Sequence, residues 1–169
     1  MNAVRALSNT RPHVPPAGHD DALACKGRWQ AVPLSDGLGP HAAEWDALNQ
    51  AQFRSHPLLS SHFWNGLLAE FGQGKVVLWM LRNGDAVLAM CLLQRRRFGH
   101  WASFLPSQAQ VGPVLIRDLK TAENLAESLR PLAVQLDLLC VDPDLWPQAE
   151  QSGQLASTQL HAQIGRAHV

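Results

Sequence analysis

The chain has 169 residues, of which 46% are hydrophobic and 17% are charged, so it has the length and composition of one globular domain and not of a disordered protein. Fourteen Lys and Arg residues balance fourteen Asp and Glu residues, which argues against a nucleic-acid binder. The only basic cluster is Arg95-Arg96-Arg97. No apolar stretch reaches the length of a membrane span, so we expect no membrane-spanning segment.

The three cysteines are far apart in the sequence. Cys91 and Cys140 lie inside apolar, strand-like runs, where a buried free thiol is expected. An odd number of scattered cysteines favours a reducing, cytoplasmic setting over a disulfide-linked scaffold.

The two ends of the chain differ from its middle. Residues 1–27 are rich in proline and poor in large apolar residues, which predicts a mobile leader; a start codon assigned too far upstream is the alternative. Residues 164–169 read Ile-Gly-Arg-Ala-His-Val, the translation of a widely used sequencing adapter, so we expect an artefact rather than a genuine polar tail. Residues 28–163 are then one domain, expected to be the N-terminal half of a longer protein.

The domain opens with a predicted strand and a predicted helix. Trp29–Leu34 roughly alternates, and Pro33 near its end is typical of an edge strand because proline cannot donate to a ladder. After a turn-rich break at residues 35–40, His41–Gln52 has the spacing of a helix. One side of it is expected to carry Trp45, Leu48 and Ala51 or Gln52, with the polar residues elsewhere: Glu44, Asp46 and Asn49.

Leu58–Gln94 is the most regular stretch and predicts one helix followed by one β-hairpin. Large apolar residues recur at the spacing of a helix face: Phe63, Trp64, Leu67, Leu68 and Phe71. Ser60 or Ser61 is expected to cap this helix, and Gly72 to end it in the left-handed conformation. Two apolar runs then flank Asn83-Gly84, a hairpin turn in which both residues are expected to have positive φ.

The remaining elements complete a mixed sheet. Trp101–Leu105 is expected to be a third strand of an antiparallel meander, followed by a loop at 106–110 and a short apolar stretch at 111–116. Either Asp118 or Thr121 caps the next helix, which bears Leu125, Leu129 and Leu132 and which Pro131 ends or kinks. Leu136–Val141 is a strand, and residues 145–163 look weakly helical. A crossover helix followed by a strand predicts a parallel pair beside the meander.

The sequence therefore predicts an α/β (α+β) fold with a mixed, largely antiparallel sheet and packed helices. Several segments on this framework resemble the N-terminal half of the GNAT superfamily of N-acetyltransferases, FemAB-like type, in the branch of BioF2-like or cellulose-biosynthesis acetyltransferases. The residues that carry the resemblance are Trp45-Asp46-Ala47-Leu48, His56-Pro57-Leu58-Leu59, Phe63-Trp64, Leu67-Leu68, Phe71-Gly72, the hairpin and Trp101–Gln108.

The resemblance implies an acyltransferase that moves an acetyl or acyl group from acetyl-CoA or another acyl-CoA to an amine, on a small-molecule or envelope-precursor substrate. In the superfamily a loop of the pattern Gln/Arg-x-x-Gly-x-Gly/Ala opens a helix and holds the pyrophosphate on backbone N–H groups. This chain departs from the pattern, because Gly112 has no second glycine and Pro113 lacks an N–H donor. A first half in this family often serves as a scaffold. The alternative is therefore a non-catalytic scaffold or partner-binding domain.

Candidate site residues are few. Ser107, Gln108 and Gln110 follow the third meander strand, where the family's central cleft is expected; they either bind substrate or a CoA arm, or form an ordinary polar loop. The arginine cluster either attracts phosphate or an acidic partner, or is a solvated strand end that protects an edge from mispairing.

Other catalytic patterns are weak. His56 and His62 lie six apart with no Cys or carboxylate at ligand spacing, which predicts no metal site. Ser61-His62 lacks the glycines of a nucleophile elbow. Asp142 and Asp144 follow the last strand, where a general base could sit, but Asp-Pro-Asp is also common turn chemistry. No catalytic residue is assigned from the sequence.

Overall fold

The structure, a computed structural model, describes residues 27–35 and 37–141, and the backbone of 159–163. The leader predicted at 1–27, apart from residue 27, and the adapter-like residues 164–169 lie outside this part of the chain. Asp142, Asp144 and most of the segment predicted to be weakly helical also lie outside it.

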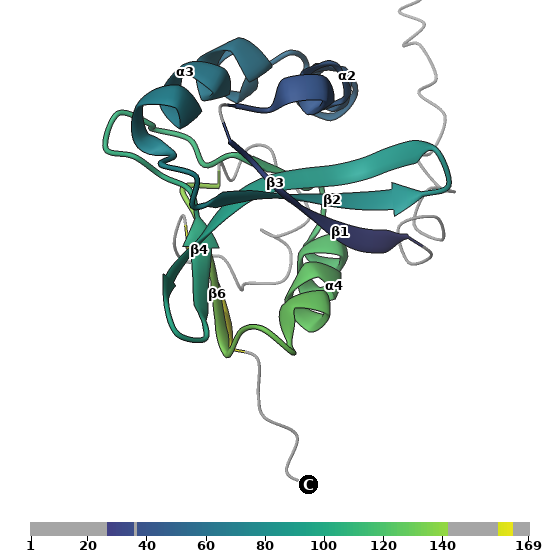
Figure 1. Cartoon of the computed structure of the whole chain (residues 1–169). Coiled ribbons are helices and arrows are strands. Elements are labelled where there is room, and N and C mark those ends of the chain that lie inside the picture. The colour runs from purple at the N-terminus through teal and green to yellow at the C-terminus, as the bar shows by residue number, and fades with distance from the viewer. Residues whose placement is uncertain (1–26, 36, 142–158, 164–169) are drawn as a thin grey trace, which may run out of the picture.

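A single mixed sheet carries helices on both of its faces (Figure 1). The strand order is β1-β2-β3-β4-β6-β7, and β5 pairs with β3. All pairs are antiparallel except β4 with β6, which is parallel. The elements are β1 (Arg28–Pro33), η1 (Gly39–His41), α2 (Ala42–Phe53), η2 (Pro57–Leu59), α3 (Ser61–Phe71), β2 (Val76–Asn83), β3 (Ala86–Arg97), β4 (His100–Ser103), β5 (Val114–Leu115), α4 (Leu119–Leu129), β6 (Gln135–Leu139) and β7 (Gln159–Gln163). The predicted α/β (α+β) class and the parallel pair are confirmed.

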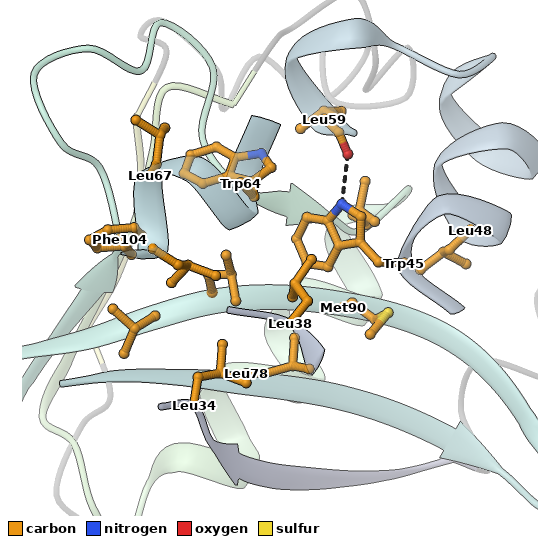
Figure 2. Packing of buried hydrophobic residues seen from close by; sticks show 14 of the residues in the cluster. Leu34, Leu38, Trp45, Leu48, Leu59, Trp64, Leu67, Leu78, Met90 and Phe104 are labelled. Carbon is orange, nitrogen blue, oxygen red and sulfur yellow. Dashed lines mark hydrogen bonds between the residues drawn. The ribbon is translucent and has the colours of Figure 1, made fainter. Parts of the chain in front are cut away.

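Helices α2 and α3 cover one face of the sheet. Ser60 is the N-cap of α3, as predicted, and its hydroxyl accepts from Phe63 N. Trp45 of α2 and Trp64 of α3 are fully buried. Trp45 donates its indole N–H to Leu59 O of η2 (Figure 2), and Trp64 donates its own to Leu58 O of the same element. The two helices are therefore joined through η2 as well as through apolar contact.

Strand β3 is the shared wall of two apolar cores. Its side chains alternate between the faces, and five consecutive residues, Ala89 to Leu93, are at most 1% exposed. Met90 and Leu92 pack in the core under α2 and α3, whereas Ala89, Cys91 and Leu93 pack in the core under α4. Burial on both faces explains why the strand reads as a continuous apolar run rather than an alternating one.

Helix α4 makes the crossover to the parallel strand. Asp118 is its N-cap, and the helix ends at Leu129 before Pro131, both as predicted. Leu125 and Leu129 are fully buried, but Leu132 lies beyond the helix and is 57% exposed. The prediction that Leu132 belongs to the buried helical face is therefore wrong, because the helix stops one turn earlier than its apolar spacing suggests.

Several local predictions need correction. The hairpin loop is Gly84-Asp85, with Asn83 still paired to Ala86, and of the loop residues only Gly84 has a positive φ. A turn with glycine at its first central position needs only one such residue. Gly72 is right-handed, with φ −69°, and the left-handed residues follow at Gln73 and Gly74.

Four further corrections concern Asn49, Phe71, Cys140 and residues 159–163. Asn49 faces inward and is 3% exposed, because its side chain exchanges two hydrogen bonds with the backbone of His56. Phe71, predicted on the buried face of α3, is 38% exposed since it lies in the last turn. Residues 159–163, predicted as weakly helical, form β7 against β6. Cys91 is buried as expected, whereas Cys140 is half-buried and follows β6. Burial raises the pKa of the Cys91 thiol.

Among the described helices, none is long and apolar enough to cross a membrane.

A small ionic network ties α2 to β2, and it predicts a pH-dependent contribution to stability. Glu44 accepts hydrogen bonds from Arg82 and from His41, the latter at 3.0 Å between Nδ1 and Oε2. The hydrogen bond from His41 is the largest cause that holds the pKa of Glu44 below its usual 4.5. Burial opposes it, and the hydrogen bond and then the charge of Arg82 add to the lowering. The folded protein therefore binds fewer protons here than the unfolded chain, so the stabilisation is present above pH 4.5 and is lost as the pH falls through the lowered pKa.

We expect Glu44→Gln to lower the free energy of unfolding by up to about 1 kcal/mol at neutral pH, because the network is partly exposed. The difference from the unaltered protein should shrink below pH 4.5 in urea titrations at a series of pH values. Glu70→Gln, which alters an exposed carboxylate on α3, is the control and should have little effect at any of them. A Glu44→Gln effect that persists at low pH would contradict the assignment.

Candidate functional site

The loop that follows β4 holds the three residues predicted to bind substrate. Ser107, Gln108 and Gln110 are all exposed. Ser107 Oγ donates to Gln108 Oε1 over 3.1 Å, so these two side chains engage each other. Ala109 between them is buried and fixes the loop, with its N–H donating to Pro106 O. The structure thus places the three residues together on one surface loop.

Gly112 lies where the superfamily pattern would have a phosphate-binding glycine, but here it serves a close approach to β6. Its N–H donates to Cys140 O over 2.8 Å. A Cβ added at residue 112 would lie 2.1 Å from Leu139 O, nearer than real Cβ atoms come to an oxygen. Residue 112 must therefore be glycine because the loop packs closely against β6, and its N–H is already hydrogen-bonded to the backbone.

The N-terminus of α4 has no free donor for an anion at its capped position. The Asp118 carboxylate accepts from Thr121 N over 2.8 Å and from Thr121 Oγ1 over 2.9 Å. A carboxylate stabilises the positive end of the helix dipole, and its own charge repels a phosphate placed there. The capping that makes α4 a stable helix thus opposes its use as an anion site.

These three observations decide whether an acyl-CoA pyrophosphate fits the described residues. A pyrophosphate loop needs several free backbone N–H groups and no negative side chain. Gly112 N is engaged, Pro113 has no N–H, and Asp118 brings a negative charge. The loop between β4 and α4 does not fit the pyrophosphate.

The parallel pair β4 and β6 brings together a polar cluster that the sequence analysis missed. His100 Nε2 and Asp137 Oδ2 lie 2.8 Å apart, and Gln135 Nε2 donates to both carboxylate oxygens of Asp137. In register, His100 pairs with Gln135 and Ala102 with Asp137. A charged residue at the centre of Leu136-Asp137-Leu138 was the one available signal, because a buried carboxylate needs partners.

This cluster can hold a histidine in one orientation, but its geometry is that of a satisfied buried carboxylate. Asp137 is 7% exposed. Two neighbouring side chains from its own strand pair satisfy its oxygens, which is what stability alone requires. We therefore assign to the cluster a structural role at the junction of the parallel strands.

No family model and no curated protein matches the chain.

The other sequence candidates lie apart from this region. Ser61 Oγ donates to Asp46, and Ser61 N donates to the same carboxylate over 2.8 Å, so this serine joins α3 to α2. His62 next to it is exposed. In the part of the chain that the structure describes, no three His, Cys, Asp or Glu residues are grouped as a metal ion would require.

Proposed function

We propose that this chain is the structural, non-catalytic N-terminal half of a GNAT-like acyltransferase, acting in the cytoplasm. The complete enzyme would transfer an acetyl or acyl group from acyl-CoA to an amine, with the cofactor held outside the described residues. Within that enzyme this half would act as a scaffold for the catalytic half.

The element order supports the proposal. The resemblance depends on a strand, two helices, an antiparallel meander, a crossover helix and a strand in that order, and β1 to β6 follow it. Three residues of the segments that carry the resemblance are core positions, since Trp45, Leu59 and Trp64 are fully buried. Such positions preserve a fold but perform no chemistry.

The loop from Gly112 to Asp118 is the main support for a non-catalytic role. Its glycine is needed for contact with β6, and its helix is capped by a carboxylate. A half that bound acyl-CoA in the manner of the superfamily would need the opposite arrangement at both positions.

The first experiment titrates the purified chain with acetyl-CoA by isothermal calorimetry. We expect no saturable heat and no shift of the unfolding temperature. Asp118→Asn is the matched variant, because it keeps the cap but removes the charge, and we expect no binding to it either. Saturable binding that Asp118→Asn strengthens would place the pyrophosphate at α4 and reject the non-catalytic role.

The second experiment tests the acyltransferase assignment itself. The genomic locus is read past the codon for Gln163, and the complete product is titrated with acetyl-CoA and assayed for acetylation of amines. We expect a downstream half with the glycine loop, and binding that depends on it. A complete product that neither carries such a loop nor binds acetyl-CoA would favour the stand-alone scaffold or partner-binding domain.

A further inference from the structure

One end of the sheet gathers exposed apolar side chains and arginines. The turn between β3 and β4 carries Phe98, which is 87% exposed, and the connection from α4 to β6 carries Leu132 and Val134, 57% and 43% exposed. Figure 1 shows this turn and this connection at the same end of the molecule. We call this surface the basic tip and define it as Arg95, Arg96, Arg97, Phe98, Arg130, Leu132 and Val134.

Backbone contacts hold the two segments of the basic tip together as one surface. Gly99 O accepts from Val134 N over 2.7 Å and from Gln135 N over 3.1 Å. Gly99 has a φ of +69°, and a Cβ there would lie 2.5 Å from Val134 Cγ2. The turn is therefore packed closely against the connection, and Phe98 projects from a turn that these contacts hold in place.

The charge of the basic tip is positive. Arg95 stacks on Phe98, with 5.4 Å from Cζ to the ring centroid, and Arg96 and Arg97 are exposed. Arg130 is 3.9 Å from Glu127, and both side chains are more than half exposed, so this pair neutralises little. Four arginines thus gather on a chain whose formal net charge is zero.

Protection of a strand edge explains only part of this arrangement. Strand β2 begins opposite Gln94, so Arg95 to Arg97 extend beyond it, where exposed charges discourage mispairing. That role gives no reason for Phe98, Leu132 and Val134 to be exposed beside them. Exposed apolar side chains that adjoin one another mark a surface that becomes covered.

We infer that the basic tip docks on the surface of an anionic phospholipid membrane. Arginine guanidinium groups bind lipid phosphates in pairs of hydrogen bonds, and each basic residue near such a surface adds to the attraction. Phe98 and its aliphatic neighbours then enter the boundary between headgroups and acyl chains. The inference is independent of the acyltransferase proposal.

A lipid surface suits the shape of the basic tip better than an acidic protein does. A peptide needs a groove or a length of unpaired strand. Here the aromatic side chain projects from a hairpin turn, and the edge of β3 that β2 leaves open spans only Arg95 to Arg97, which would give an added strand few hydrogen bonds. A fluid headgroup layer accommodates a projecting side chain without a preformed pocket.

The test is co-sedimentation of the full chain with vesicles of phosphatidylcholine alone and of phosphatidylcholine mixed with phosphatidylglycerol. We expect binding to the anionic vesicles only, weakened by salt. Arg96→Gln with Arg97→Gln should lower the partition coefficient by roughly 30-fold, about fivefold for each arginine. Phe98→Ser should lower it by roughly tenfold, the expected contribution of one buried aromatic side chain.

Matched controls come from elsewhere on the surface. Arg28→Gln with Arg54→Gln removes two exposed arginines near the other end of the sheet. Arg28 lies there because it pairs with Arg82, and Arg54 because the helix before it contacts Leu88. Phe71→Ser removes an exposed aromatic residue of α3. Both controls should bind as the unaltered chain does, and far-ultraviolet circular dichroism of all variants should be unchanged.

Four outcomes would overturn the inference. These are no binding to anionic vesicles, equal binding to neutral vesicles, equal losses in the tip and control variants, and binding that Phe98→Ser leaves unchanged. Sedimentation velocity tests whether a second copy of the chain binds the basic tip, and a polyglutamate titration tests whether an acidic protein does. Self-association abolished by Phe98→Ser without lipid binding would indicate a second copy, and polyglutamate binding that equals vesicle binding would indicate an acidic protein.

Discussion

Replacing Trp45 with alanine is expected to lower the free energy of unfolding by about 3–5 kcal/mol, a large part of the roughly 5–15 kcal/mol of a typical domain. Trp45 is fully buried between α2 and the sheet, beside Leu38, Leu48 and Met90 (Figure 2). Its removal leaves a cavity and also leaves Leu59 O without the indole donor that lies 2.6 Å away. With a urea m-value of roughly 2 kcal/mol/M, the midpoint of unfolding should fall by about 2 M.

Two variants separate the contributions. Trp45→Phe keeps most of the apolar volume but loses the donor, so it should cost about 1–3 kcal/mol. Phe98→Ala removes a comparable ring that is 87% exposed and should change stability by less than about 0.5 kcal/mol. A Trp45→Ala effect no larger than that of Phe98→Ala would mean that this core is not packed as described.

Gly112→Ala is the second substitution with a large expected effect, a loss of about 2–3 kcal/mol. The new methyl group would meet Leu139 O at 2.1 Å, and a backbone oxygen cannot rotate away as the end of a side chain can. Relief requires the loop to move off β6, which would break the hydrogen bond from Gly112 N to Cys140 O. Urea unfolding measures the loss, and amide exchange at Gly112 should accelerate in the variant.

Gly66→Ala is the matched control for this substitution. Gly66 lies inside α3, and a Cβ there would meet nothing within 4 Å. Alanine favours the helix over glycine, so stability should rise by about 0.5–1 kcal/mol. If Gly112→Ala were as harmless as Gly66→Ala, the glycine would have no packing role against Leu139.

The elements that local patterns determine were predictable from the sequence. Ser60 and Asp118 cap helices in the structure as they were predicted to, because an N-cap needs only its own side chain and the next turn. Leu78 and Met90 lie in long apolar runs, and both belong to strands that are buried on two faces. The parallel pair followed from one crossover helix.

What depends on distant partners was not predictable. Asn49 faces inward because His56 offers both a donor and an acceptor, a circumstance that no helical spacing reveals. Residues 159–163 become a strand because β6 presents an edge to them. His100 and Asp137 are 37 residues apart, and only the register of β4 and β6 joins them.

For the candidate site too, the local position was predictable from the sequence and the distant contacts were not. The sequence predicts that Ser107, Gln108 and Gln110 follow a strand, and they do, but it does not predict that their side chains are exposed. Gly112 was recognised as a departure from the phosphate-loop pattern. Its actual role, contact with Leu139, needed the three-dimensional structure.

The position of β3 as a wall shared by two cores has a consequence for the motions of the protein. Amide hydrogens exchange with solvent where the structure opens, and a strand is exposed only when its neighbours separate from it. Opening of the α4 layer uncovers Cys91 and Leu93 but leaves Met90 and Leu92 under α2 and α3, and the converse also holds. The central amides of β3 should therefore be the last to exchange with deuterium, and their exchange should require global unfolding. Each helical layer can open separately without exposing them.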